Sequence, residues 1–93
     1  MLIESRDVRR LNRLVNELKK HSLWVERHSY SIRIIYNNTI VASLHLYPGF
    51  NEAVLRLYGG VVDNYVYSTV SRVLREVLGD FKLIVKRIVR EEL

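Results

Sequence analysis

The sequence predicts one α+β domain over residues 1–93, in which two helices cover one face of a four-stranded antiparallel meander and a further strand follows. Apolar residues recur every three or four positions in segments 7–20 and 64–78, the spacing of a buried helical stripe. From residue 23 to residue 58 they alternate with period two, which indicates strands. A chain of 93 residues has room for one thin core and no second domain. The expected order is α-β-β-β-β-α-β.

The first helix is expected over residues 7–20, with Ser5 as its N-cap. Its apolar stripe consists of Val8, Leu11, Leu14, Val15 and Leu18. Opposite this stripe the spacing places Arg6, Arg10, Arg13 and Lys20, with Arg9 nearby. We therefore expect a basic outer face on this helix, either solvated or in contact with phosphates.

The pairing of the strands follows from which residues must share the core face, since a slip of one residue inverts every side chain. Even-numbered positions are apolar both in 30–36 and in 39–47. A three-residue connection at 37–39 keeps both sets on one face, whereas a two-residue Asn-Asn turn would oppose Ile34 to Val41 and separate them. We predict the three-residue hairpin.

The next reversal is expected at Pro48-Gly49. It aligns three pairs of core residues: Leu44 with Ala53, Ala42 with Leu55 and Ile40 with Leu57. A reversal at residues 28–29 brings the first strand onto the same face and completes the meander.

Asp63 is a suitable cap for the second helix, and Gly79 lies just past its end. Segment 81–89 fits either a helix, by its apolar spacing, or a strand, by its many β-branched residues. We predict a strand.

The outward set of the meander is unusual for a solvated face, because it mixes rings, guanidinium groups and aliphatic residues. Its members are Trp24, Arg33, Ile35, Val41, Ser43, His45, Tyr47, Val54, Arg56 and Tyr58. Tyr47 and Tyr58 are the tyrosines expected to expose their rings. The predicted register puts Trp24 beside Arg33, and Arg56 beside Val41 and Ile35.

Rings stack on bases and arginines neutralise phosphates, as binding of single-stranded DNA or RNA requires. The net charge of +5 and the pI near 9.8 agree with an anionic partner. The candidate binding residues are Trp24, Arg33, Tyr47, Arg56 and Tyr58 on the sheet and Arg6, Arg10 and Arg13 on the first helix. The same face also suits a homodimer or docking on a larger protein, or it has no binding role.

Chemical catalysis finds no support in the sequence, and we expect neither an enzyme nor a cofactor. Cysteine is absent, and the three histidines lack the spacing of a metal site. His45 and Glu52 face each other in the predicted register, which leaves a small toxin-like ribonuclease, using His45 with Arg33, Tyr47 or Glu52, as a third hypothesis. No apolar run is long enough to span a membrane, and residues 1–4 do not open a signal peptide, so we expect a cytoplasmic protein.

In element order and in the surface residues Trp24, Arg33, Tyr47, Arg56 and Tyr58, the chain resembles the ThermoDBP-related single-stranded-DNA-binding proteins of hyperthermophilic archaea. This resemblance implies binding of single strands by basic and aromatic side chains on a short sheet packed against helices. The richness in Arg, Val and Glu and the lack of cysteine are compatible with a hot intracellular origin. No diagnostic motif is shared, so the resemblance assigns no residue.

Overall fold

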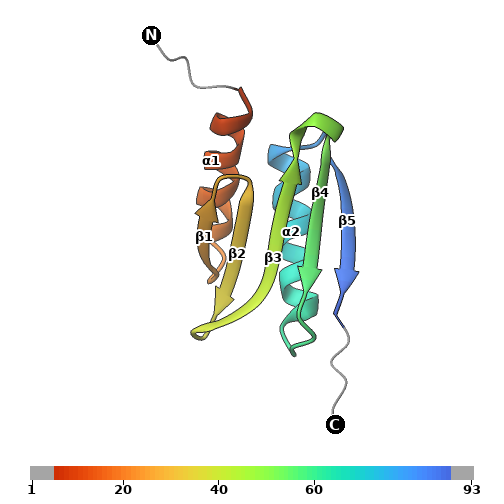
Figure 1. Cartoon of the computed structure of the whole chain (residues 1–93). Coiled ribbons are helices and arrows are strands. Elements are labelled where there is room, and N and C mark those ends of the chain that lie inside the picture. The colour runs from red at the N-terminus through yellow and green to blue at the C-terminus, as the bar shows by residue number, and fades with distance from the viewer. Residues whose placement is uncertain (1–5, 89–93) are drawn as a thin grey trace.

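A computed structural model of the chain describes residues 6–88, and the side chains of residues 7–88. Two helices and five strands follow one another in the order α-β-β-β-β-α-β (Figure 1). The predicted fold class and element order are therefore confirmed. Ser5, the predicted N-cap, and Val89, the last residue of the predicted final strand, lie outside the described residues.

The two helices, α1 (Arg6–Lys19) and α2 (Asp63–Val77), bury their predicted apolar stripes, except that Val8 at the start of α1 is only partly buried. The most buried members are Leu11, Leu14 and Leu18 on α1 and Val66, Val70 and Val73 on α2. The start of α2 differs from the prediction, because Asp63 is its first residue and does not cap it. One carboxylate oxygen of Asp63 instead accepts a hydrogen bond from the backbone N–H of Gly59 at 3.2 Å. Asp63 therefore fixes the loop before the helix.

Five strands form one sheet in the order β1-β2-β3-β4-β5. Their bounds are β1 Trp24–His28, β2 Ser31–Tyr36, β3 Thr39–Tyr47, β4 Glu52–Leu57 and β5 Lys82–Arg87. The first four strands make the predicted antiparallel meander. β5 confirms the predicted final strand and pairs in parallel with β4, because α2 carries the chain back along the sheet before β5 begins.

The turn between β2 and β3 differs from the prediction of three residues. Asn37 and Asn38 alone connect the strands, and Tyr36 pairs with Thr39. Both asparagines have positive φ, 50° and 61°. Two-residue hairpin turns favour this conformation because its twist matches that of the flanking strands, and asparagine tolerates it better than most residues.

A β-bulge in β3 corrects the register that this short turn would otherwise impose. Ile35 pairs with Ile40 and Ile34 pairs with Ala42, so Val41 is an extra residue on β3. The predicted core pair of Ile34 and Ala42 therefore forms. The bulge also exchanges two neighbours: Val41, predicted to face outward, is 9% exposed in the core, whereas Ile40, predicted to be core, is 42% exposed.

The connection between β3 and β4 is longer than the predicted Pro48-Gly49 turn. Residues 48–50 form a single 3-10 turn and Asn51 follows with a φ of 50°. Ala53 therefore pairs with Leu46, whereas its predicted partner Leu44, two residues earlier in β3, pairs with Leu55. A displacement of two residues keeps each side chain on its predicted face but changes its neighbours, so the predicted pairing was wrong and the predicted facing was right.

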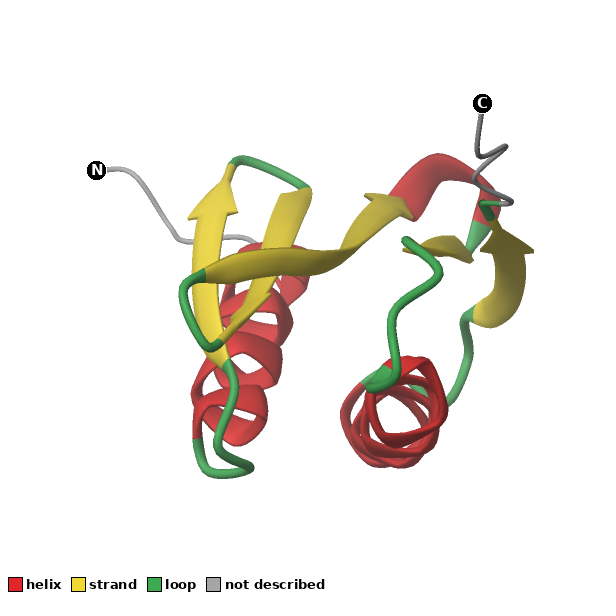
Figure 2. Cartoon of the chain, turned by 90° about the horizontal axis from the view of Figure 1, so that it is seen from below, coloured by secondary structure: helices red, strands yellow, loops and turns green. Residues whose placement is uncertain are grey.

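Both helices pack against the same face of the sheet, here called the inner face (Figure 2). α1 contacts β1, α2 contacts β3 and β4, and the helices contact each other. The core between them contains completely buried residues from several strands, among them Ile32, Ile34, Leu44, Leu55 and Leu57. Burial of each such side chain stabilises the fold by about 1.5–3 kcal/mol. No helix among residues 6–88 covers the opposite face.

Candidate functional site

The uncovered side of the sheet, here called the outer face, consists of the side chains that alternate with the core residues along each strand. Its charged members are Glu26 on β1, Arg33 on β2, Glu52 and Arg56 on β4, and Lys82 and Lys86 on β5. Four of these six side chains are basic and two are acidic, so the face is positive. Its other members are aromatic, hydroxyl-bearing or aliphatic.

One row of the sheet carries most of the positive charge. Arg33 pairs with Ser43, Ser43 pairs with Arg56, and Arg56 pairs with Lys86, so these residues lie side by side on four adjacent strands. Glu26 pairs with Arg33 at the β1 end of the row. Among the described side chains, neither arginine has an ion pair within 4.0 Å or a hydrogen bond. Their charges are therefore available to an anion.

A hollow of about 510 Å³ lies over this row. Its lining includes Arg33, Ser43, Arg56 and Tyr58, together with Ser31 and His45 at one end. The hydroxyl of Ser31 and Nδ1 of His45 are 2.5 Å apart and share a hydrogen bond. The hollow thus combines two cationic groups with several neutral polar groups.

Trp24 lies beside a second hollow on the same face, about 820 Å³ in volume and lined also by Glu26, Ile35 and Asn38. The indole is 61% exposed. The ammonium of Lys19, from the end of α1, lies 5.5 Å from the centre of the ring. A ring exposed to this degree, with a cation beside it, can stack on a planar ligand that carries negative charge.

The two tyrosines predicted to be exposed differ from each other. Tyr47 is 38% exposed, as predicted, and its ring centre lies 4.5 Å from that of His45. Tyr58 is half-buried and lines the 510 Å³ hollow, so less of its ring is exposed than predicted. Tyr47 therefore offers the more accessible stacking surface.

The predicted neighbours on the outer face were wrong, because the register differs. Trp24 pairs with Ile35, and its predicted neighbour Arg33 lies opposite Glu26. Arg56 pairs with Ser43, because the longer β3–β4 turn displaces the pairing by two residues.

The pair predicted for a ribonuclease is also absent from the register of the described strands. His45 pairs with Val54, and Glu52 pairs with Tyr47. His45 does share the 510 Å³ hollow with Arg33.

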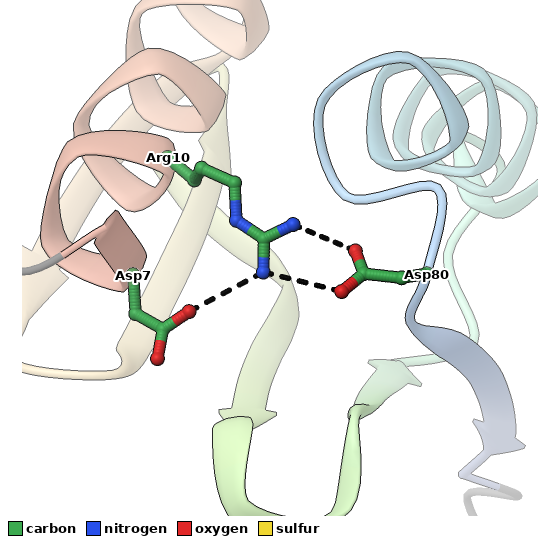
Figure 3. A network of polar contacts seen from close by, with 3 residues as sticks. All are labelled: Asp7, Arg10 and Asp80. Atoms are coloured by element: carbon green, nitrogen blue, oxygen red, sulfur yellow. Dashed lines mark hydrogen bonds and ion pairs between the residues drawn. The ribbon is translucent and has the colours of Figure 1, made fainter.

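Arg10 does not lie on the exposed outer side of α1, as the helical projection predicted. One of its terminal nitrogens donates to Asp80 at 2.7 Å and the other contacts Asp7 at 3.3 Å (Figure 3). These two contacts outweigh partial burial, and the hydrogen bond to Asp80 contributes most to raising the pKa of Arg10 above its ordinary value. Its guanidinium also lies 5.4 Å from the ring centre of Phe81. Arg10 therefore links α1 to the segment between α2 and β5.

The remaining candidates on α1 lie apart from the outer face. Arg9 and Arg13 are exposed. The side chain of Arg6 lies outside the described part of the chain. Because α1 packs on the inner face, its solvent-exposed side and the outer face of the sheet point away from each other (Figure 2). The structure does not bring the two predicted sets together.

The outward set predicted from the sequence lacked several residues that lie on the outer face, among them Glu26, Ile40, Lys82, Ile84 and Lys86. Placing Ile40 on the outer face required knowledge of the bulge in β3. The lysines alternate with Leu83 and Val85, so their facing could have been read from the period of segment 81–89. Their position next to β4 could not be predicted in this way, because sequence periodicity does not identify which strands are neighbours.

Comparison of the chain with protein-family models, with curated proteins and with solved structures gives no match. The resemblance to ThermoDBP-related proteins therefore stays a prediction. Within residues 6–88, no cluster of three or more His, Asp or Glu side chains could hold a metal ion. Neither described helix has the length and apolar character needed to cross a bilayer.

Proposed function

We propose that this protein binds single-stranded nucleic acid through the outer face of its sheet and does so without catalysing a reaction. The observation that carries the proposal is the row of Arg33, Ser43, Arg56 and Lys86, whose arginines have no acidic partner within 4.0 Å among the described side chains. Such a row can neutralise phosphates of a single strand.

The aromatic side chains of the same face support a single-stranded ligand over a duplex. Trp24 lies on β1 and Tyr47 at the end of β3, so exposed rings lie on either side of the basic row. Stacking requires bases that are free of a partner strand, and each stacked base is worth about 1–3 kcal/mol. A flat phosphate track without rings would fit a duplex equally well.

Fluorescence anisotropy with a labelled oligonucleotide of about 16 nucleotides tests the proposal. Micromolar binding at about 50 mM salt is expected, with a slope of log affinity against log salt of about −0.7 for each phosphate neutralised. Absence of binding at that salt concentration would refute the proposed function. Electrophoresis of the recovered oligonucleotide checks that it stays intact; cleavage that is lost in His45→Ala would favour the ribonuclease hypothesis.

A pair of charge-matched variants locates the binding surface. Arg33→Gln/Arg56→Gln and Arg9→Gln/Arg13→Gln each remove two positive charges, the first from the outer face and the second from α1. The outer-face variant is expected to lose at least about tenfold in affinity, and the α1 variant to lose less. The reverse ranking would place the site on the helix.

Self-association through the same face is the second candidate. It is favoured by aliphatic side chains at the edges of the basic row, because Ile40 and Ile88 are each 42% exposed. Small domains with thin cores often gain stability by burying such residues in a dimer. Light scattering over a range of protein concentrations distinguishes the two: a constant monomer mass contradicts self-association, and a dimer that dissociates on adding oligonucleotide shows that both partners use one face.

A further inference from the structure

Within the basic row of the outer face, a small residue, Ser43, lies between two arginines. Ser43 lies on β3, and both of its cross-strand partners are arginines, Arg33 on β2 and Arg56 on β4. Adjacent strands are about 4.8 Å apart, so the two arginine backbones lie on either side of the serine at about that spacing. The short side chain of Ser43 lies between these two long side chains, and all three line the 510 Å³ hollow.

Neither arginine of this hollow has an ion pair within 4.0 Å among the described side chains, and of the two only Arg56 is partly buried, since Arg33 is exposed. Arg56 is half-buried, and desolvation of a charge is costly unless the charge is paired. Glu26 lies opposite Arg33 in the register, yet its carboxylate is not within 4.0 Å of that guanidinium. An anion with several oxygen atoms would satisfy both guanidinium groups at once.

We infer that the hollow between Arg33 and Arg56 binds a single phosphate group of the strand, held by both guanidinium groups and by the hydroxyl of Ser43. The planar fork of arginine matches the oxygen atoms of a phosphate in a way that the point charge of lysine does not. Tyr58 lines the same hollow, so the sugar or base attached to this phosphate would rest against its ring. This inference rests on the proposed function and makes it more specific, since it distinguishes one built phosphate subsite from a diffuse basic surface.

Charge-conserving variants test the subsite with the anisotropy assay already described. Arg33→Lys and Arg56→Lys keep the charge but remove the bidentate fork, and each is expected to lower affinity about tenfold while leaving the salt slope unchanged. Ser43→Val keeps the charge, favours a strand and fills the space between the arginines, so it is expected to weaken binding similarly. Arg75→Lys, on the exposed side of α2, is the matched control and should bind like the wild type. Melting curves establish that each variant is folded.

Two outcomes overturn the inference, and they are distinguishable. If the wild type binds the oligonucleotide and the three outer-face variants bind equally well, the proposed function stands and the phosphate subsite is wrong. If the wild type does not bind at all, the proposed function itself fails and the inference fails with it. Loss of binding in the three variants, with the control unaffected, supports the subsite.

Discussion

The inner and outer faces of the sheet are built by alternate residues of the same strands, yet different forces select those residues. In β4, Leu55 is completely buried on the inner face, whereas the next residue, Arg56, is partly exposed on the outer face. Two helices cover the inner face, so removal of apolar surface from water accounts for its composition. The outer face has no such cover among the described residues and carries charges, rings and hydroxyl groups together. Packing under the helices therefore does not account for its composition, and the proposed function rests on this face.

The largest contrast between the faces is expected for neighbouring residues of β4. Leu55→Ala leaves a cavity in the core and should lower the free energy of unfolding by about 2–5 kcal/mol. Arg56→Ala should change it by no more than about 0.5–1 kcal/mol, because its guanidinium has no ion pair among the described side chains. Urea denaturation of both variants measures this difference. Equal losses would mean that Arg56 is part of the core.

The bulge in β3 offers a second and smaller contrast. Val41→Ala removes two carbon atoms from a buried position and should cost about 1–2 kcal/mol. Ile40→Ala removes more atoms, but at a position that is 42% exposed, and should cost less than Val41→Ala. Thermal or urea unfolding compares them. Regular alternation without the bulge predicts the opposite ranking, so a larger loss of stability for Ile40→Ala would contradict the bulged register of β3.

A smaller effect is expected on affinity when an acidic group of the outer face is neutralised. Glu26 lies at the end of the basic row, opposite Arg33. Under the proposed function, its negative charge would repel a phosphate strand bound there. Glu26→Gln should therefore tighten oligonucleotide binding about two- to threefold at low salt, and less at high salt. Glu76→Gln, on the exposed side of α2, makes the same change of charge away from the face. Equal gains for both variants would show that only net charge matters.

The smallest effect concerns the ion pair between Glu17 of α1 and Lys20, the residue that follows the helix, which lies on neither face of the sheet. Lys20 donates to Glu17 at 2.9 Å, and this hydrogen bond is the main cause that lowers the pKa of Glu17 below 4.5. Lys20→Ala should raise that pKa toward 4.5, as a carboxyl titration by NMR would measure. Because the pKa is lower in the folded state, the pair stabilises the fold above about pH 4.5 and stops doing so as pH falls through the folded value. An unchanged titration would show that the pair does not persist in solution.

Most of the fold could be predicted from the sequence because burial imposes a period on it. The spacing of Leu11, Leu14 and Leu18 is sufficient to identify α1, and alternation identifies the meander. The turns were less predictable, because more than one connection satisfies the same core pattern. A two-residue turn with a bulge and a three-residue turn both bring Ile34 opposite Ala42, and only the three-dimensional structure distinguishes them.

The candidate site depended on register, so its members were more predictable than their neighbours. The alternation of side chains along each strand was sufficient to place Trp24, Arg33 and Arg56 on the outward side of the sheet, where the structure also has them. Alternation could not identify Ser43 as the residue between the two arginines, because this pairing depends on the length of the turn between β3 and β4. Nor could a helical projection show that Arg10 turns toward Asp80, which is 70 residues away in the chain.

That separation between Arg10 and Asp80 has a consequence for how the protein folds. Joining residues 70 positions apart requires the ends of a long segment to meet, and the entropy cost of such closure grows with the length of the segment. We expect the bridge to form after the folding transition state, so that Arg10→Met accelerates unfolding and leaves the folding rate nearly unchanged. Stopped-flow measurements of both rates would show it, and a slower folding rate would instead place this contact in the nucleus. If the bridge forms late, the contact between α1 and the segment that connects α2 to β5 slows unfolding of the native protein without changing the rate at which it folds.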